Sequence, residues 1–231
     1  MKMQVLMTAL LAAAGITLNA TTPEIKENSI LYGDTKVSCA KNGVITISTL
    51  KGVFATIACH YSVVNPAEKK TDWSPVKEED CTMSYQDRKF TWVLNRKAFG
   101  KTWKAVDQTL EILENGQLKL SIKEYPAPEG LKLFDNCIYT HFPIPAINGK
   151  SVQFQGKEVK MTVGKAPISR IQLPSVRGIK GFTYIFPLGQ GSVTLFSECF
   201  NGLTAFNRTG KVRLTWFLPP SGAGTLIIDV K

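Results

Sequence analysis

Apolar and polar residues alternate in short runs along most of the chain after residue 20, and turn-forming residues separate the runs. Neighbouring side chains of a strand point to opposite faces of a sheet, so this alternation is typical of strands with one buried face. The apolar spacing of an amphipathic helix, i, i+3, i+4, i+7, does not recur over any long stretch. The pattern predicts about sixteen short strands, at residues 30–32, 37–40, 43–50, 53–64, 81–85, 89–96, 106–113, 118–124, 131–142, 152–155, 158–163, 170–173, 182–186, 193–199, 212–218 and 225–230.

Strands with turn signals about every dozen residues favour an all-β fold, an antiparallel β-sandwich with little helix. Residues 65–80, NPAEKKTDWSPVKEED, hold two prolines and few apolar residues, which predicts a surface loop. Breaks are also expected at residues 143–150, PIPAINGK, and 219–224, PPSGAG. Residues 21–231 are enough for one large domain, which we take as the domain organisation.

Residues 106–124, VDQTLEILENGQLKLSIKE, give the clearest hairpin signal, with apolar residues on alternate positions of both arms. A two-residue Asn-Gly turn would place Lys119 opposite Ile112, a charge against a core position. A three-residue loop at 114–116 places Leu118 there instead. The glycine of that loop then takes the left-handed position of a bulged turn, which it adopts without a Cβ clash. We therefore predict the longer loop.

Residues 1–20, MKMQVLMTALLAAAGITLNA, have the pattern of a secretory signal peptide: a basic start at Lys2, an apolar run, and a small residue, Ala20, at the end. The apolar run is too short to cross the roughly 30 Å core of a membrane, and no later segment predicts a transmembrane helix. We expect the mature protein to begin at Thr21 and to be exported, either periplasmic or secreted.

The chain is basic, with 28 Lys and Arg against 18 Asp and Glu and a net charge of +10. Residues 21–135 are almost neutral, whereas residues 136–231 hold 11 basic residues and only three acidic ones. Such a field attracts anions, so it favours an anionic polysaccharide as partner, with solubility as the alternative explanation. No sequence motif indicates a nucleic-acid partner. The basic residues expected to form one surface are Lys150, Lys157, Lys160, Lys165, Arg170, Arg177 and Lys180.

Five cysteines lie in residues 21–231: Cys39, Cys59, Cys81, Cys137 and Cys199. Disulfides persist in exported proteins, so we expect at least one, and the odd number leaves one thiol over. The alternative is that these cysteines are buried as small hydrophobic residues. Their wide spacing favours neither a zinc site nor a redox pair, and we expect no metal and no cofactor.

The two histidines each lie beside a tyrosine in a predicted strand, His60 next to Tyr61 and His141 close to Tyr139. His60, Tyr61, Tyr139 and His141 are the candidate catalytic acids and bases if the fold brings them together, and the histidines are otherwise ordinary strand residues. No nucleophile elbow, phosphate loop or zinc-protease motif is present. The two carboxylates of a glycoside hydrolase have no characteristic spacing in the sequence, so the presence of such a pair stays an open possibility. One acidic strand residue, Glu124, is interpreted as facing solvent.

Residues 88–103, RKFTWVLNRKAFGKTW, combine aromatic and basic residues without any acid. Aromatic faces stack on sugar rings, and Arg and Lys pair with carboxylate or sulfate groups. Trp92 is predicted to be a core residue of an ordinary hairpin, whereas Trp73 and Trp103 are expected to be exposed. The candidate ligand-binding residues are Trp73, Arg88, Arg96, Lys101 and Trp103.

Residues 101–124, KTWKAVDQTLEILENGQLKLSIKE, resemble the hairpins of β-supersandwich domains in bacterial carbohydrate-active proteins, the galactose-mutarotase-like group. The catalytic histidine and glutamate motifs of true mutarotases find no match here. The resemblance therefore implies a carbohydrate context as an accessory domain. Three hypotheses follow: a non-catalytic glycan-binding module, a glycan lyase or glycoside hydrolase, and a surface assembly protein without a sugar ligand.

Overall fold

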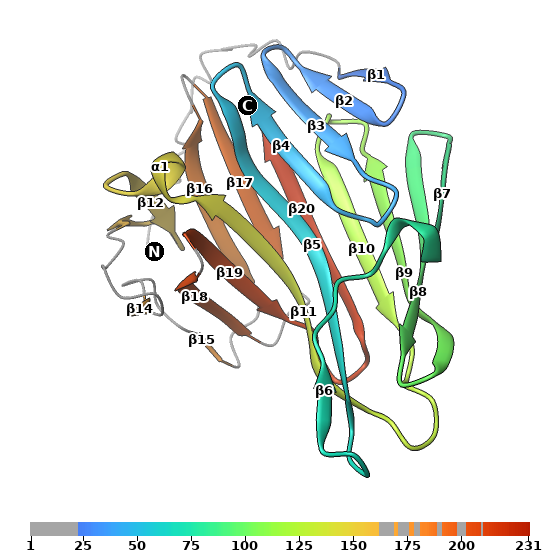
Figure 1. Cartoon of the computed structure of the whole chain (residues 1–231). Coiled ribbons are helices and arrows are strands. Elements are labelled where there is room, and N and C mark those ends of the chain that lie inside the picture. The colour runs from blue at the N-terminus through green and yellow to red at the C-terminus, as the bar shows by residue number, and fades with distance from the viewer. Residues whose placement is uncertain are drawn as a thin grey trace, which may run out of the picture.

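The fold is an antiparallel sandwich of two β-sheets, which confirms the predicted fold class (Figure 1). The computed structural model describes residues 23–161, 169–170, 176–177, 181–188, 191–197, 202–208 and 210–231. Within these residues the helical structure is confined to one 3-10 turn, Glu78–Asp80, and one short helix, α1, Ile144–Ile147. The predicted signal peptide and Cys199 lie outside the described residues.

Sheet A joins strands from the first and second halves of the chain, because β5 pairs with β11, which in turn pairs with β19. Its strand order is β1-β2-β3-β4-β5-β11-β19-β18-β14, with β6 beside β5 and β15 beside β18. Its strands are β1 (Glu24–Lys26), β2 (Ser29–Tyr32), β3 (Thr35–Cys39), β4 (Ile45–Thr49), β5 (Gly52–Asn65), β6 (Lys70–Asp72), β11 (Lys132–Pro143), β14 (Ser169–Arg170), β15 (Val176–Arg177), β18 (Gly202–Arg208) and β19 (Lys211–Phe217).

Sheet B has the order β13-β12-β16-β17-β20-β10-β9-β8-β7, so the last strand of the chain lies at its centre. Its strands are β7 (Cys81–Gln86), β8 (Lys89–Ala98), β9 (Lys101–Ile112), β10 (Leu118–Glu124), β12 (Ser151–Phe154), β13 (Lys157–Lys160), β16 (Phe182–Leu188), β17 (Gly191–Ser197) and β20 (Ala223–Val230).

The predicted strands are present, and the structure adds four that the pattern did not predict: β1, β6, β15 and β18. β6, with the sequence KTD, lies inside the segment predicted to be a loop and pairs only with the end of β5. Its residues are polar and not buried, so the alternation of buried and exposed residues that reveals a strand is absent from it. The predicted break at 143–150 contains helix α1.

The register predicted for the β9–β10 hairpin is confirmed, since Leu118 pairs with Ile112. The backbone N–H of Gly116 donates to the carbonyl of Leu113, and Gly116 has a φ of 82°. This is the left-handed conformation that a bulged three-residue turn requires.

The core lies between the two sheets and is dominated by fully buried aromatic and β-branched side chains. Trp92 is buried, as predicted, and its indole N–H donates to the carbonyl of Ala40 across the sandwich at 2.9 Å. The rings of Phe142 and Phe186, from opposite sheets, lie 4.6 Å apart. Packing and hydrogen bonds between the sheets thus fix how they face each other.

The cysteines in the described residues do not form the expected disulfide. No disulfide joins Cys39, Cys59, Cys81 and Cys137 to one another. Burial raises the pKa of the Cys39 thiol to about 12 and raises that of Cys59 well above its usual value. Such thiols behave as small hydrophobic groups, which was the alternative interpretation of the sequence. A disulfide that involves Cys199, which lies outside the described residues, stays a prediction.

Candidate functional site

Two exposed aromatic residues form a pair at one end of β5. Trp73 is 51% exposed and Phe134 is 56% exposed, and their rings meet edge to face with centroids 4.8 Å apart. Exposed apolar side chains that lie against one another, rather than singly, are typical of an interaction surface. We call these two residues, together with His60 and Tyr139 beside them, the aromatic platform.

A β-bulge in β11 explains why Phe134 is exposed. Leu133 pairs with Val63 and Asp135 pairs with Ser62, which leaves Phe134 as an extra residue without a partner on β5. A bulge interrupts the alternation of side chains between the two faces of a strand and changes the direction of one side chain. The run 131–142 reads as a continuous strand in the sequence, so this bulge was not predicted.

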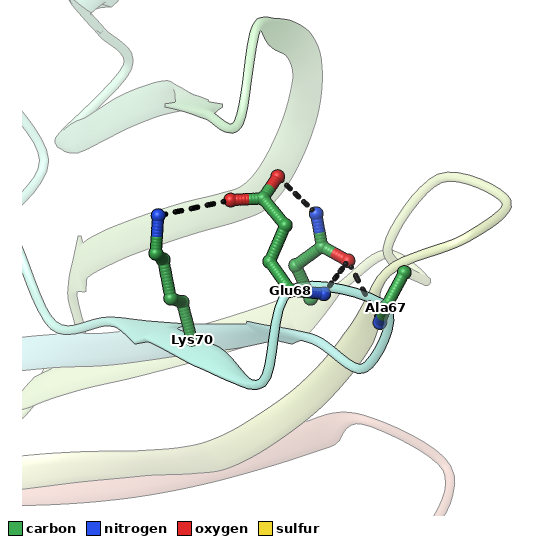
Figure 2. Close-up of polar contacts among 4 residues, drawn as sticks. Ala67, Glu68 and Lys70 are labelled. Atoms are coloured by element: carbon green, nitrogen blue, oxygen red, sulfur yellow. Dashed lines mark hydrogen bonds and ion pairs between the residues drawn. The ribbon is translucent and has the colours of Figure 1, made fainter.

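The direction of Trp73 follows from strand β6, which directly precedes it and is joined to β5 by a hydrogen-bonded turn. In the turn between β5 and β6, the Asn65 side chain accepts from the backbone N–H of Ala67 and donates to Glu68, which pairs with Lys70 at 3.3 Å (Figure 2). Asp72, the last residue of β6, lies opposite Val63, a core residue. Asp72 therefore points toward sheet B, and Trp73 lies on the other face beside His60.

Behind the exposed pair, a stack of rings continues across the outer face of sheet A. The His60 ring stacks on Tyr139 with centroids 4.5 Å apart, and the Trp73 ring lies 6.1 Å from His60 at an angle of 19°. On the other side of Tyr139 lie the His141 ring, at 5.6 Å, and the Arg213 guanidinium, 4.2 Å from the ring centroid. The strand register explains this, because it places Tyr139, His141 and Arg213 on one face.

The electrostatic environment of this face is positive. The pKa of His141 is lowered to about 4, first by burial and then by the charges of Arg213 and Lys211, with a smaller effect from His60. His141 is therefore neutral at pH 7. A neutral imidazole beside a guanidinium and a phenol ring can accept a proton, and the guanidinium can pair with an anionic group.

A buried polar cluster lies beneath the platform, between the sheets. The Arg96 guanidinium, only 3% exposed, donates to the Asp72 carboxylate at 2.9 Å. Partial burial alone would raise the pKa of Asp72, but hydrogen bonds from Ser74 and the Arg96 charge hold it below its usual value. The Tyr61 hydroxyl donates to the carbonyl of Tyr125 at 2.7 Å. These bonds tie the segment that carries Trp73 to sheet B.

The structure brings some of the predicted ligand-binding residues together and separates others. Trp73 is exposed as predicted, but Trp103 is half-buried and its indole N–H donates to the Tyr61 hydroxyl at 3.3 Å. Arg96 is buried in its ion pair with Asp72 and cannot reach a ligand at the surface. The expectations for Trp103 and Arg96 are therefore wrong, because both lie on the inward face of the β8–β9 hairpin.

The two remaining candidates lie at opposite ends of that hairpin. Lys101 starts β9 and donates to the carbonyl of Glu129, whereas Arg88 precedes β8 and donates to the carbonyl of Leu113. The strand rise of about 3.3 Å per residue separates the two ends by roughly 30 Å. The five residues thus do not form one surface.

Among the candidate catalytic residues, His60, Tyr139 and His141 lie together on the outer face of sheet A. Tyr61 points the other way, into the core, and its pKa is raised mainly by burial. The residues that the sequence did not reveal at this end are Phe134, Asp72, Arg213 and Glu124. Glu124 is 8% exposed, so the interpretation that it faces solvent is wrong.

The basic residues of the second half are placed only in part. Lys150, Lys157 and Lys160 are exposed. Glu158 and Lys160, two positions apart on β13, share a face opposite Val159, which packs on the core. The side chains of Lys165, Arg170, Arg177 and Lys180 lie outside the described part of the chain, so a shared basic surface stays a prediction.

Within the described residues, no group of three or more His, Cys, Asp or Glu side chains gathers as metal ligands would. In the same part of the chain, no helix is both long and apolar enough to span a membrane.

No protein-family model and no curated protein matches the sequence. Among solved structures, an alpha-mannosidase from Enterococcus faecalis V583 is similar, with a TM-score of 0.48 and 11% sequence identity. The match covers 88% of this chain but 29% of the mannosidase chain, so this chain spans less than a third of that protein. A likeness of this size assigns neither activity nor substrate to this chain.

Proposed function

We propose that the protein is an exported, non-catalytic module that binds an anionic glycan through the aromatic platform. The observation that carries this proposal is the exposed Trp73–Phe134 pair, which is mounted on a rigid sheet. The pyranose ring presents apolar C–H edges that pack on aromatic faces, and an exposed ring pair offers such a face without rearrangement.

The preference for an anionic sugar rests on the charges near the platform. Arg213 lies beside Tyr139, and Arg213 and Lys211 together contribute to the low pKa of His141. A carboxylate or sulfate on the sugar would find positive charge within the same face. Such binding weakens as salt screens the charges, since the Debye length falls from about 10 Å at 0.1 M to about 3 Å at 1 M.

The experiment is affinity chromatography of the mature protein on immobilised alginate, a uronate polymer, and on immobilised dextran, a neutral one, with a salt gradient. We expect retention on alginate at low salt, and we expect Trp73→Ala and Phe134→Ala each to weaken it about tenfold, as for a central aromatic contact. Tyr85→Ala is the matched control, because Tyr85 is 41% exposed on β7 of the other sheet.

Each outcome has a clear meaning. If Trp73→Ala is retained like the wild type, the retention comes from net charge alone and the platform is not the glycan site. If neither column retains the wild type, glycan binding is refuted. Retention on dextran that salt does not weaken would refute the preference for an anionic sugar and keep the platform.

A second candidate function, a glycan lyase, is favoured by one observation: His60, Tyr139, His141 and Arg213 lie together. In β-elimination from a uronate, a base removes the C5 proton, the bond from C4 to the glycosidic oxygen breaks, and that oxygen takes up a proton. Neutral His141 could serve as the base while Arg213 pairs with the substrate carboxylate. Ultraviolet absorption of the unsaturated product on incubation with alginate tests this. Product from the wild type but not from His141→Gln would replace the non-catalytic proposal.

The proposal of export rests on residues 1–20. Expression of the full chain in a bacterium that secretes proteins, followed by N-terminal sequencing, is expected to give Thr21 as the first residue. An intact Met1 on the recovered protein would refute it.

A further inference from the structure

A hollow of about 1110 Å³ opens at the other end of the sandwich, far from the aromatic platform. Its walls come from five segments that are distant in sequence, including the β4–β5 turn, helix α1, the end of β16 and the last residue, Lys231. In Figure 1 the β4–β5 turn and the C-terminus lie close together at the top of the molecule. The volume is slightly above the range typical of small-molecule sites, about 300–1,000 Å³.

Apolar side chains line much of the hollow. Leu50, in the β4–β5 turn, is 85% exposed, and Val53 is 48% exposed. Beyond them lie Phe54, Pro145 and Leu188. Of the five large hydrophobic residues exposed in the described part of the chain, Leu50 and Val53 thus lie at this hollow, and Trp73 and Phe134 belong to the aromatic platform. Exposed apolar residues that gather around a concavity are typical of a ligand site.

A second β-bulge shapes the wall. Ile47 pairs with Ala55 and Ser48 pairs with Val53, which leaves Phe54 as the extra residue of β5. Its ring contacts Phe142 and Phe186, with centroids at 5.6 Å and 6.4 Å, and so closes the core beneath the hollow. Core packing therefore fixes the position of Phe54 in the wall of the hollow.

The lining of the hollow carries charges of both signs. Lys51 and Lys150 line the hollow and form no ion pair within the described residues. Lys231 also lines it, but its ammonium group is paired with Asp229 at 3.2 Å. The lining also holds the Asp34 carboxylate and, at Lys231, the carboxylate that ends the chain. Lys51 and Lys150 are therefore the groups in the lining that can pair with an anion.

We propose that this hollow binds an amphipathic anion, a small molecule whose apolar body lies against Leu50 and Val53 and whose acidic group meets Lys51 and Lys150. The site is separate from the aromatic platform and independent of the function proposed for it.

Two fluorescent probes with the same aromatic skeleton test the proposal: 8-anilinonaphthalene-1-sulfonate, which is anionic, and N-phenyl-1-naphthylamine, which is neutral. Each is titrated into the folded mature chain, residues 21–231. We expect the anionic probe to bind more tightly, and its affinity to fall about five- to tenfold in the double variant Lys51→Gln/Lys150→Gln, as for two partly exposed ion pairs. The neutral probe should be unaffected by that variant.

Val53→Trp fills the hollow from an exposed position and should abolish binding of both probes. Lys157→Gln, an exposed lysine on the β12–β13 hairpin, is the matched control for the lysine variants and should bind like the wild type. Circular dichroism and urea midpoints confirm that every variant is folded.

The proposal is overturned if neither probe binds the wild type, if Val53→Trp leaves binding intact, or if the double lysine variant leaves the affinity of the anionic probe unchanged. Loss of probe binding in Trp73→Ala, with Val53→Trp unaffected, would place the dye on the platform and would equally refute the site.

Discussion

The two ends of β5 carry exposed apolar residues in different ways. At one end Trp73 and Phe134 stand on the outer face of sheet A, above the buried ion pair of Arg96 and Asp72. At the other end Leu50 and Val53 border an open hollow whose lysines are exposed. The 14 residues of β5 span on the order of 45 Å between them.

Both ends depend on a β-bulge that leaves one phenylalanine out of register, Phe134 on β11 and Phe54 on β5. The bulge turns Phe134 out to solvent, where it pairs with Trp73, whereas it keeps Phe54 in contact with the core. A β-bulge thus contributes to the exposed aromatic platform at one end of β5 and to the wall of the hollow at the other. The energetic difference is that charged groups are buried at the platform end and exposed at the hollow end.

The largest expected effect is at the platform end. Asp72→Asn leaves the buried Arg96 guanidinium without its counter-ion, so we expect it to lower the free energy of unfolding by about 3 kcal/mol and to loosen Trp73. Urea denaturation measures the stability, and tryptophan fluorescence reports on Trp73.

Glu79→Gln is the matched control, because the pair of Lys77 and Glu79 is exposed on both sides and should contribute less than about 0.5 kcal/mol. The double variant Asp72→Asn/Arg96→Met should recover part of the lost stability. If Asp72→Asn costs no more than Glu79→Gln, the ion pair does not hold this end together.

The next largest expected effect is a loss of folding stability as the pH is lowered. The pKa of folded His141 is about 4, below the value of about 6.5 in the unfolded chain. Between these values the unfolded state binds a proton that the folded state does not, so stability falls as the pH is lowered. We expect a loss of about 2 kcal/mol between pH 7 and pH 5 from this residue. His141→Asn should lose less over the same range in urea denaturation, and an equal loss would contradict the low pKa.

A smaller effect is expected at the hollow end, in the β9–β10 turn. The carbonyl of Gly116 accepts a hydrogen bond from Tyr32, a residue of the hollow, at 2.7 Å. Gly116 has a φ of 82°, and a Cβ there would meet only Pro23, at 3.9 Å. Gly116→Ala should therefore cost about 1 kcal/mol through backbone strain alone. Thermal unfolding measures it, and a variant as stable as the wild type would show that the turn relaxes.

The smallest expected effect on the free energy of unfolding is that of the exposed lysines at the hollow end. Lys51→Gln and Lys150→Gln should each change the free energy of unfolding by less than about 0.5 kcal/mol, because their ammonium groups are exposed and take part in no ion pair within the described residues. Urea midpoints measured beside those of Asp72→Asn give the comparison. A cost above 1 kcal/mol would mean that these lysines stabilise the fold itself.

Much of the fold could be predicted from the sequence, because a sheet with one buried face imposes a period of two that is visible in the residues themselves. The register of the β9–β10 hairpin followed from the rule that a charge does not face Ile112, and the structure confirms it. β6 could not be predicted in this way, since it is a polar edge strand without a buried face.

The site was less predictable. Trp73 stands out as an aromatic residue in a polar segment, but the exposure of Phe134 depends on a bulge, and nothing local in the run 131–142 marks it. Arg96 looks like a surface residue in the sequence and is buried, because its partner Asp72 comes from the other sheet.

The sequence by itself determined the all-β class, the positions of most strands and the β9–β10 turn, since each depends on residues within a few positions of one another. The tertiary structure decided which face of each hairpin is covered, where the bulges point Phe54 and Phe134, and which charges are buried as pairs. These features arise from contacts between residues far apart in the chain, such as Trp73 with Phe134 and Arg96 with Asp72, and the alternation along one strand carries no information about them.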